Sequence, residues 1–196
     1  MNWAIDIIAG IQPTTLLCFY RYKFCDPSLF LKDNNIIFPG SFNPVHNAHL
    51  VIGNKAIFEL CISNFYKGDA SPYDIYHRIN MLSSCGIPVL LTKAKTYTEK
   101  NTVLKQCVDQ SYTYRIGGDA WNRCSKDAHM FYGLDDAKIE VYPYQDEPVN
   151  NLDFVNYSIV HKPKPIVRSS DIRNQLTKDF LPQSVISYIQ KNNLYK

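Results

Sequence analysis

Two histidines stand three residues apart in the segment Gly40–His49, which reads G-S-F-N-P-V-H-N-A-H. At helical spacing His46 and His49 share one face, so both imidazoles can donate hydrogen bonds to one phosphate and carry positive charge as negative charge builds on it. The glycine and the prolines predict a tight turn that leaves the backbone N–H groups of Ser41 and Phe42 free. A turn, a helix N-terminus and two histidines together favour an anion site.

Two other interpretations of this histidine pair stay open on spacing alone. Histidines at this spacing can bind a metal ion, but no Cys, Asp or Glu stands close in the sequence as a third ligand, so we predict no metal site. His46 and His49 can also be solvated surface residues. The strand and the G-S-F-N-P turn that precede them favour the anion site.

A second candidate anion site lies late in the chain, in the segment Arg168–Arg173. Ser169 or Ser170 can cap the helix that we expect to follow, and its exposed N–H groups with Arg173 in the first turn suit a polyphosphate. Taken alone, the segment is more typical of a plain N-cap beside a surface arginine.

The third candidate is the segment Gly117-Gly118-Asp119, which follows an apolar stretch. Glycine lets a ligand approach the backbone closely, and a carboxylate after a strand can accept hydrogen bonds from ribose hydroxyls. A simple turn explains the same residues when they are considered alone.

Length and composition bound what these segments can belong to. The chain has 196 residues, of which 45% are hydrophobic and 20% charged, with a formal net charge of +3. These values predict one globular domain and exclude a disordered chain and a disulfide-stapled miniprotein. The small positive charge suits an anionic small molecule as well as a nucleic acid and does not separate the two.

The cysteines and the N-terminal apolar stretch point to a cytoplasmic protein. The six cysteines are scattered without C-x-x-C or zinc-finger spacing, so we expect reduced, structural thiols. The stretch from Ala4 to Tyr20 is apolar, but polar residues, Gly10 and Pro13 interrupt it. It therefore lacks the uninterrupted run of about 20 apolar residues that a bilayer span needs.

Hydrophobic patterning predicts strands that alternate with helices, and therefore an α/β fold with a mostly parallel sheet. The predicted strands are 15–20, 36–38, 87–92, 112–116 and 137–142, with weaker candidates at 154–160 and 166–167. The predicted helices are 2–10, 46–60, 76–84, 102–110, 169–177 and 182–192. The three polar segments then follow strands and are expected at one edge of the sheet, where such folds bind ligands.

The three segments, in this order, resemble the nucleotidyltransferase superfamily with the H-x-G-H motif. The likeness is greater to the nicotinamide/nicotinate mononucleotide adenylyltransferase family, because His77–Leu82 also resembles its H-R-x-x-M-L segment and Leu181–Tyr195 its C-terminal helix. The resemblance covers residues 36–196, which we expect to form the nucleotidyltransferase domain. It leaves residues 1–35 as an N-terminal extension of unknown role, either an extra layer on the fold or the remnant of something longer.

This resemblance implies a Rossmann-like, doubly wound fold and transfer of AMP from ATP to a mononucleotide, with release of pyrophosphate. Mg²⁺ would neutralise the triphosphate, no nucleic acid or membrane partner is implied, and a homo-oligomer stays open. His46, His49 and Arg173 are the implied catalytic residues. The implied nucleotide-binding residues are Gly40, Ser41, Phe42, Asn43, Gly118, Asp119, Ser169 and Ser170.

The chain departs from the family pattern at three places. Ala48 replaces the glycine of the motif, no lysine cluster directly precedes His77-Arg78, and the tryptophan that stacks on the pyridine ring is missing. Phe131 or Tyr132 could replace that tryptophan, since any aromatic face can stack. These departures leave three alternatives: a different acceptor such as phosphopantetheine, CTP as donor, or a nucleotide-binding module without activity.

Overall fold

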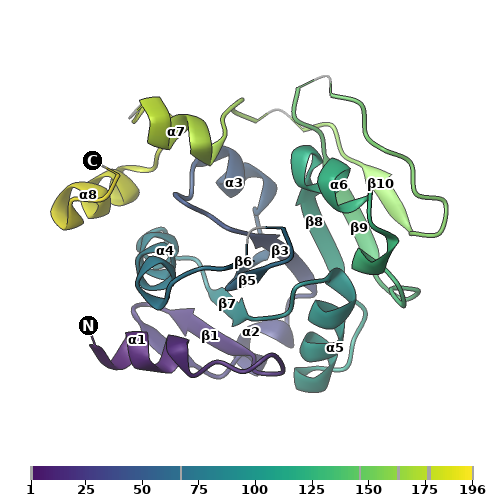
Figure 1. Cartoon of the computed structure of the whole chain (residues 1–196), viewed down its shortest axis with the longest axis horizontal. Helices are drawn as coiled ribbons and strands as arrows, with labels where there is room; N and C mark the ends of the chain where they lie inside the picture. The colour runs from purple at the N-terminus through teal and green to yellow at the C-terminus, as the bar shows by residue number, and fades with distance from the viewer. Residues whose placement is uncertain (1, 67, 146, 163, 176–177, 196) are drawn as a thin grey trace.

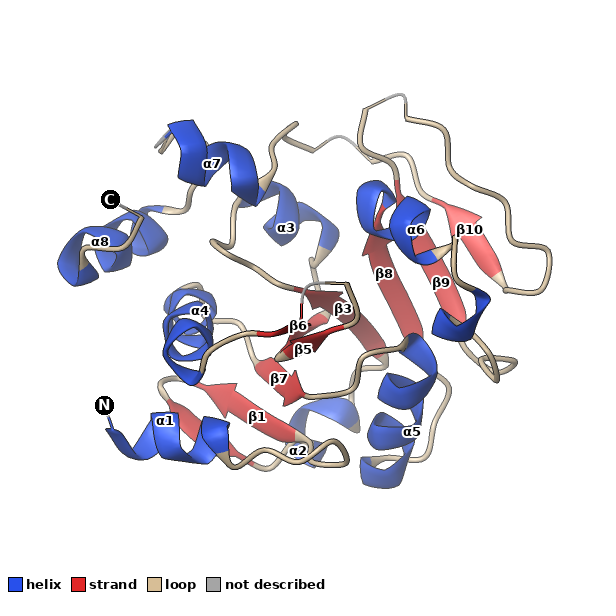
Figure 2. Cartoon of the chain, in the orientation of Figure 1, coloured by secondary structure: helices blue, strands red, loops and turns tan. Residues whose placement is uncertain are grey.

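The computed structural model describes residues 2–66, 68–145, 147–162, 164–175 and 178–195. Its largest element is an eight-stranded sheet in the order β10-β9-β8-β3-β4-β7-β1-β2, drawn in red in Figure 2. The strands are β1 (Leu17–Tyr20), β2 (Lys23–Cys25), β3 (Ile36–Gly40), β4 (Ile57–Cys61), β7 (Val89–Thr92), β8 (Thr113–Gly117), β9 (Lys138–Tyr142) and β10 (Tyr157–Ile159). A separate hairpin pairs β5 (Ser63–Asn64) with β6 (Gly68–Asp69).

Helices connect the strands and pack on both faces of the sheet (Figure 1). The helices are α1 (Asn2–Ala9), α2 (Ser28–Leu31), α3 (Asn47–Ile52), α4 (Pro72–Ser84), α5 (Tyr97–Cys107), α6 (Gly118–Cys124), the 3-10 turn η1 (Ala128–Met130), α7 (Ser169–Gln175) and α8 (Gln183–Asn192). The predicted α/β class with a mostly parallel, doubly wound sheet is confirmed, since the six strands from β10 to β7 run parallel.

Alternation along each central strand divides the core into two layers. In β3, β4 and β7 successive residues face opposite layers of the core. In β3, for example, Phe38 faces the side of α1, α3, α4 and α8, and Ile37 faces the side of α2, α5 and α6. Successive side chains of a strand point to opposite faces. Because both faces are covered, these strands are apolar almost throughout, as is usual for parallel sheets.

The order of connections reverses between β3 and β8. After β3 the chain adds β4 and β7 on one side, then crosses to add β8, β9 and β10 on the other. The β3–β4 pairing continues to Gly40, but the β3–β8 pairing stops at Ile37, so these two strands are not paired at their carboxyl ends. A doubly wound sheet binds its ligand in the crevice at this kind of reversal.

The first 35 residues contribute two strands to the main sheet. β1 pairs antiparallel with β7, with Leu17 opposite Leu91, and β2 then pairs antiparallel with β1 as the edge strand. Ile8 of α1 and the nearby Ile11 lie in the same buried cluster as Ile75 and Ile79 of α4. These contacts attach the segment to the layer that carries α4.

The predicted helix 46–60 is wrong in its second half. Helix α3 ends at Ile52, and residues 57–61 form the central strand β4 instead. Gly53 terminates the helix, and a Cβ atom at this position would lie 2.2 Å from the Phe58 ring, so only glycine allows the strand to return this closely. The run Ile57–Leu60 is buried on both sheet faces, which removes the alternation that would identify a strand.

Other boundaries differ from the predictions because capping signals were missed. Helix α5 begins at Tyr97 rather than 102, after a capping box in which Thr96 Oγ accepts from the Glu99 N–H (3.1 Å). Helix α4 begins at Pro72, with Ser71 as N-cap. The candidate strand 154–160 shortens to β10, 166–167 is not a strand, and positions 176–177 of the predicted helix 169–177 lie outside the described residues.

All six cysteines are free thiols, as predicted. No helix among the described residues combines the length and the apolar character needed to cross a bilayer.

A buried ion pair joins β4 to α5. Lys100, 3% exposed, donates from Nζ to Glu59 Oε1 (3.1 Å) and to the Ala94 carbonyl (2.6 Å). Glu59, fully buried, also accepts from Thr92 Oγ1 (2.7 Å) and Cys61 Sγ (3.2 Å). Both charges are therefore satisfied inside the protein, which is the condition for holding them away from water.

We expect Lys100→Met to lower the free energy of unfolding by about 3–5 kcal/mol, because it leaves the Glu59 carboxylate buried without its cation. Lys105→Met is the matched control, since Lys105 pairs with Asp136 in solvent and its loss should leave stability nearly unchanged. Urea unfolding of both variants measures the difference. Equal effects of the two substitutions would contradict this reading of the buried pair.

Candidate active site

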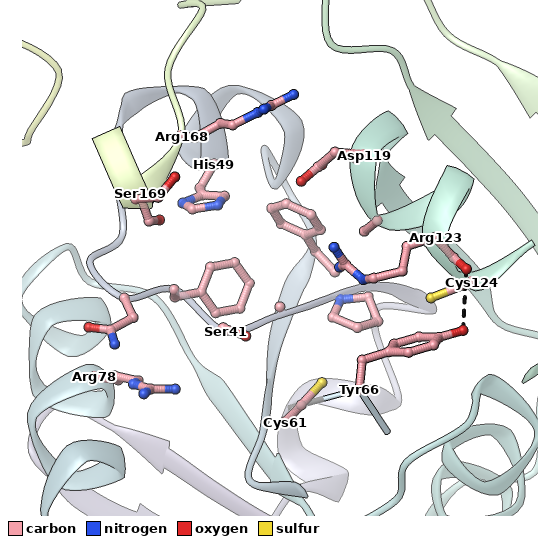
Figure 3. A pocket seen from close by; sticks show the side chains of 18 of the residues that line it. Ser41, His49, Cys61, Tyr66, Arg78, Asp119, Arg123, Cys124, Arg168 and Ser169 are labelled. Carbon is pink, nitrogen blue, oxygen red and sulfur yellow. Dashed lines mark hydrogen bonds between the residues drawn. The ribbon is translucent and has the colours of Figure 1, made fainter. Parts of the chain in front are cut away.

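A cleft of about 570 Å³ opens at the carboxyl ends of β3, β4, β8 and β9 (Figure 3). It lies at the reversal between β3 and β8, where the two strands are not paired. All eleven predicted site residues line this cleft: Gly40, Ser41, Phe42, Asn43, His46, His49, Gly118, Asp119, Ser169, Ser170 and Arg173. The fold therefore brings together three segments that are up to 133 positions apart in the sequence.

The two histidines lie face to face at the start of α3. Their rings stack with centroids 3.6 Å apart and planes 19° from parallel. The backbone N–H of His46 donates to His49 Nδ1 (3.3 Å). Because Nδ1 of His49 is the acceptor, the proton of its neutral ring is on Nε2, which makes Nε2 a hydrogen-bond donor.

Both imidazoles are neutral at pH 7 in the protein without ligand. Burial lowers the pKa of His46 to about 4, although Asp119 and Asp171 oppose the shift. Burial also brings the pKa of His49 well below its usual range, and a charge on His46 would lower it further. The pair is therefore ready to donate hydrogen bonds, and it gains positive charge only when an anion stabilises the protonated ring.

Aromatic rings fix the position of His49. Phe42 is buried, and its ring meets the His49 ring edge to face with centroids 5.1 Å apart. Phe38 and Phe58 pack against Phe42 at 5.4 and 4.9 Å. Phe42 has a positive φ of 44°, a conformation that costs free energy for a residue with a side chain and that this packing maintains.

Helix α7 is tied to the loop that precedes the histidines. Ser169 Oγ donates to the Pro44 carbonyl (2.9 Å), and Arg173 Nη1 donates to the Asn43 carbonyl. Tyr195, close to the C-terminal end, donates from its hydroxyl to Asn43 Oδ1. Asn43 thus holds the loop to two later segments, and the Ser169–Arg173 segment faces the same cleft as His49.

Gly118 and Asp119 begin α6 on the opposite wall of the cleft. A Cβ atom on Gly118 would lie 2.9 Å from the Pro143 Cα and 3.1 Å from the Tyr144 nitrogen, and both neighbours are backbone atoms that cannot rotate away. The absence of a side chain at position 118 is therefore a packing requirement. It allows α6 to start directly against the segment that follows β9.

Positive charge is concentrated on the cleft. Among the described residues that line it, seven are basic and three are acidic: Arg78, Lys95, Lys100, Arg123, Lys164, Arg168 and Arg173 against Asp69, Asp74 and Asp119. Two of the seven are already paired, Lys100 with Glu59 and Arg168 with Glu147, which leaves five cations against three carboxylates. The composition predicted that the chain suits an anionic ligand, and this cleft is where the structure places the positive charge that such a ligand needs.

Several of these cations were not predicted as site residues. Arg78 of α4 faces the cleft, and no described residue accepts a hydrogen bond from its buried Nε. Burial lowers the pKa of Arg78, Asp74 opposes this, and nearby Arg173 lowers the pKa further. The H-R dipeptide at residues 77–78 was the available signal, but only the folded chain brings Arg78 near Arg173.

The two aromatic residues suggested as stacking partners do not line the cleft. Phe131 is buried and stacks on Tyr97 with centroids 5.1 Å apart, and Tyr132 is an exposed residue beside Phe154. The expectation of a stacking ring at 131 or 132 is wrong because η1 and its neighbouring turn pack against α5. Phe65 and Tyr66, between β5 and β6, are exposed aromatic residues that do line the cleft.

Protonation of the buried histidines should destabilise the protein as pH falls. The pKa of His46 in the folded state is about 4, below the ordinary value of 6.5. Between about pH 6.5 and 4 the unfolded chain therefore binds more protons than the folded chain, and the free energy of unfolding decreases as the pH falls through this range. His46 alone should contribute on the order of 3 kcal/mol. His46→Gln should flatten the pH dependence measured by urea unfolding, and an unchanged slope would contradict the assignment.

Gly118→Ala should lower the free energy of unfolding by about 1–3 kcal/mol, because the added methyl group meets backbone atoms at 2.9 and 3.1 Å. Gly10→Ala is the matched control, since its Cβ would meet no atom closer than 3.5 Å. Thermal melts compare the two. Nucleotide binding by the Gly118 variant should fall as well, whereas an intact melting temperature would show that α6 can move aside.

Comparison with known proteins agrees with the fold. The sequence profile of the family described as cytidylyltransferase-like matches residues 37–175. In Mycoplasma genitalium, the "Probable nicotinate-nucleotide adenylyltransferase/Ap4A hydrolase" is 30% identical over 84% of this chain and 53% of its own length. This chain therefore spans about half of that relative. A "Probable nicotinate-nucleotide adenylyltransferase" of Enterococcus faecalis is 28% identical over 80% of this chain and 82% of its own.

Solved structures show the same architecture. The nicotinic acid mononucleotide adenylyltransferase of Plasmodium falciparum, complexed with APC, superposes with a TM-score of 0.61 at 19% identity, over 83% of this chain and 96% of its own. Its complex with NaAD gives a TM-score of 0.56. The family profile begins in β3 and ends in α7, and so it includes all three segments of the cleft. On this match, the chain belongs to the cytidylyltransferase-like family, a family of nucleotidyltransferases.

Proposed function

We propose that this chain transfers AMP from ATP to nicotinate or nicotinamide mononucleotide, forming the dinucleotide and releasing pyrophosphate. The observation that carries the proposal is the meeting of Gly40–His49, Gly118–Asp119 and Ser169–Arg173 in one basic cleft. The names of the Mycoplasma and Enterococcus relatives support a pyridine mononucleotide as acceptor.

In this proposal the triphosphate lies between α3, α4 and α7. Ser170, Arg173 and Arg78 hold the β- and γ-phosphates, and Asp119 accepts hydrogen bonds from the adenosine ribose. His46 and His49 contact the phosphates next to the reacting centre. Arg78 and Arg173, which form no ion pair with a described carboxylate, supply positive charge that the neutral histidines do not.

The proposed reaction is an in-line displacement at the α-phosphorus. An oxygen of the acceptor 5′-phosphate forms the new bond to the α-phosphorus, the bond from that phosphorus to the oxygen bridging to the β-phosphate breaks, and pyrophosphate leaves with the electron pair. No side chain needs to form a covalent intermediate, so catalysis is positioning and charge stabilisation. The Nε2–H of His49 donates to a non-bridging oxygen as charge builds there.

Mg²⁺ is expected to arrive with ATP as part of the substrate. Among the described residues, no group of three or more His, Cys, Asp or Glu side chains could form a metal site. The phosphate oxygens are the ligands that Mg²⁺ takes most readily in such reactions, often with one or two carboxylates. The carboxylates that line the cleft, and that are candidates to assist in binding Mg²⁺, belong to Asp69, Asp74 and Asp119.

Turnover with defined substrates tests the proposal. The protein with Mg²⁺–ATP and either pyridine mononucleotide should release pyrophosphate and form the dinucleotide. If neither acceptor leads to release of pyrophosphate, the proposal is overturned. A thermal shift that is larger with CTP than with ATP would point to a cytidylyltransferase. ATP binding without any turnover would identify a module that binds nucleotide only.

His49→Ala should reduce kcat about 10²- to 10³-fold with little change in the KM for ATP, because it removes a donor that acts mainly in the transition state. His129→Ala is the control, since His129 is exposed and lies outside the cleft-lining residues. Steady-state pyrophosphate release measures both. A His49 variant with unaltered kcat would remove this residue from the mechanism.

A further inference from the structure

Arg123 brings a cation into the cleft without a carboxylate partner. It lies in the last turn of α6, lines the cleft and extends from the helix toward the centre of the cavity (Figure 3). Asp119 stands four positions earlier on the same helix, yet no described carboxylate forms an ion pair with Arg123. No described residue accepts from its buried Nε either. A partly buried guanidinium in this state is a site for an anion.

The surroundings of Arg123 select a planar ligand. Its guanidinium carbon lies 5.8 Å from the centre of the Tyr66 ring, and the Tyr66 hydroxyl donates to the Arg123 carbonyl (3.2 Å). Phe65 packs edge to face on Tyr66 at 5.1 Å, and these two rings are 48% and 40% exposed on the cleft rim. Cys61 and Cys124 complete this wall (Figure 3). Aromatic and thiol groups around one cation fit a flat ring that carries a negative substituent.

This part of the cleft is separate from the residues assigned to phosphate. His49, Ser169 and Arg78 lie on the far side of the cavity from Arg123 and Cys124 in Figure 3. Those residues belong to α3, α7 and α4, whereas Arg123 and Tyr66 belong to α6 and the β5–β6 hairpin. Arg123 is therefore not needed for the phosphate groups and can bind the base of the acceptor, at the end opposite its phosphate.

We propose that Arg123, supported by Tyr66, determines which acceptor base the chain uses. Arg123 pairs with a carboxylate on the ring, in the two-pronged geometry that a guanidinium and a carboxylate share, and Tyr66 covers the ring face. The chain then takes nicotinate mononucleotide in preference to nicotinamide mononucleotide, whose neutral amide leaves the partly buried cation without a counter-charge. The inference rests on the proposed function.

The kinetic test compares two acceptors that differ only in this group. Wild-type kcat/KM should be at least about 10-fold higher for nicotinate than for nicotinamide mononucleotide, and Arg123→Gln should lower the nicotinate value about 10- to 100-fold while changing the nicotinamide value little. Arg21→Gln is the matched control, because Arg21 lies 5.2 Å over the Tyr20 ring and outside the cleft. Its kinetics should equal wild type.

The pattern of loss separates the possible roles of Arg123. An equal loss with both acceptors would mean that Arg123 contacts the phosphate they share, and an unchanged preference would mean that it reads neither group; each outcome overturns the inference. Tyr66→Leu should raise the KM of both acceptors by the same factor, since both present the same ring face.

A binding measurement without ATP keeps this inference distinct from the proposed reaction. Calorimetric titration of wild type and Arg123→Gln with each mononucleotide should show tighter binding of nicotinate mononucleotide that disappears in the variant. If the protein shows this preference but no adenylyl transfer, the proposed function fails and the base selection stands. Wild-type protein that binds both equally, or neither, overturns the selection whatever the turnover.

Discussion

The pairing between β3 and β8 ends at Ile37, and the site depends on that early end. Beyond it, β3 stays bonded to β4 as far as Gly40, while β8 continues along β9 to Gly117. The two strands therefore deliver their following loops to opposite sides of a gap rather than into one continuous edge. The loops that follow β3 and β8 carry two of the three predicted segments of the cleft, and α7 brings the third.

The positive field of the cleft comes from arginine and lysine, not from the histidines that give the sequence its most visible motif. Outside the lining residues, the sequence retains fourteen basic and fifteen acidic residues, so the remainder of the chain is close to neutral. A highly charged anion is then attracted to one region of the surface, and added salt should slow its capture. The neutral histidines offer donors whose charge develops only beside a bound anion.

The loops that carry the three motifs could be predicted from the sequence, but strand β4 and several other residues that line the cleft could not. Gly40–His49 and Ser169–Arg173 were predictable because turn residues and helix caps are local signals, and parallel strands bring their carboxyl ends to one edge. β4 was hidden because a strand buried on both faces has the same continuous apolar pattern as a buried helix. Arg123 and Tyr66 carry no local signal, and the H-R dipeptide at residues 77–78 did not show that Arg78 faces the cleft, since only tertiary packing turns these side chains toward it.

The edge strands β1 and β2 constrain the order in which the sheet can form. Leu17 of β1 pairs with Leu91 of β7, more than seventy residues later, and the other neighbour of β1 in the sheet is β2. During synthesis the first hairpin leaves the ribosome long before β7 exists, so it has no sheet to join and must wait with its apolar face uncovered. The hairpin is thus translated well before the strand that it joins, and its place in the sheet depends on that later strand.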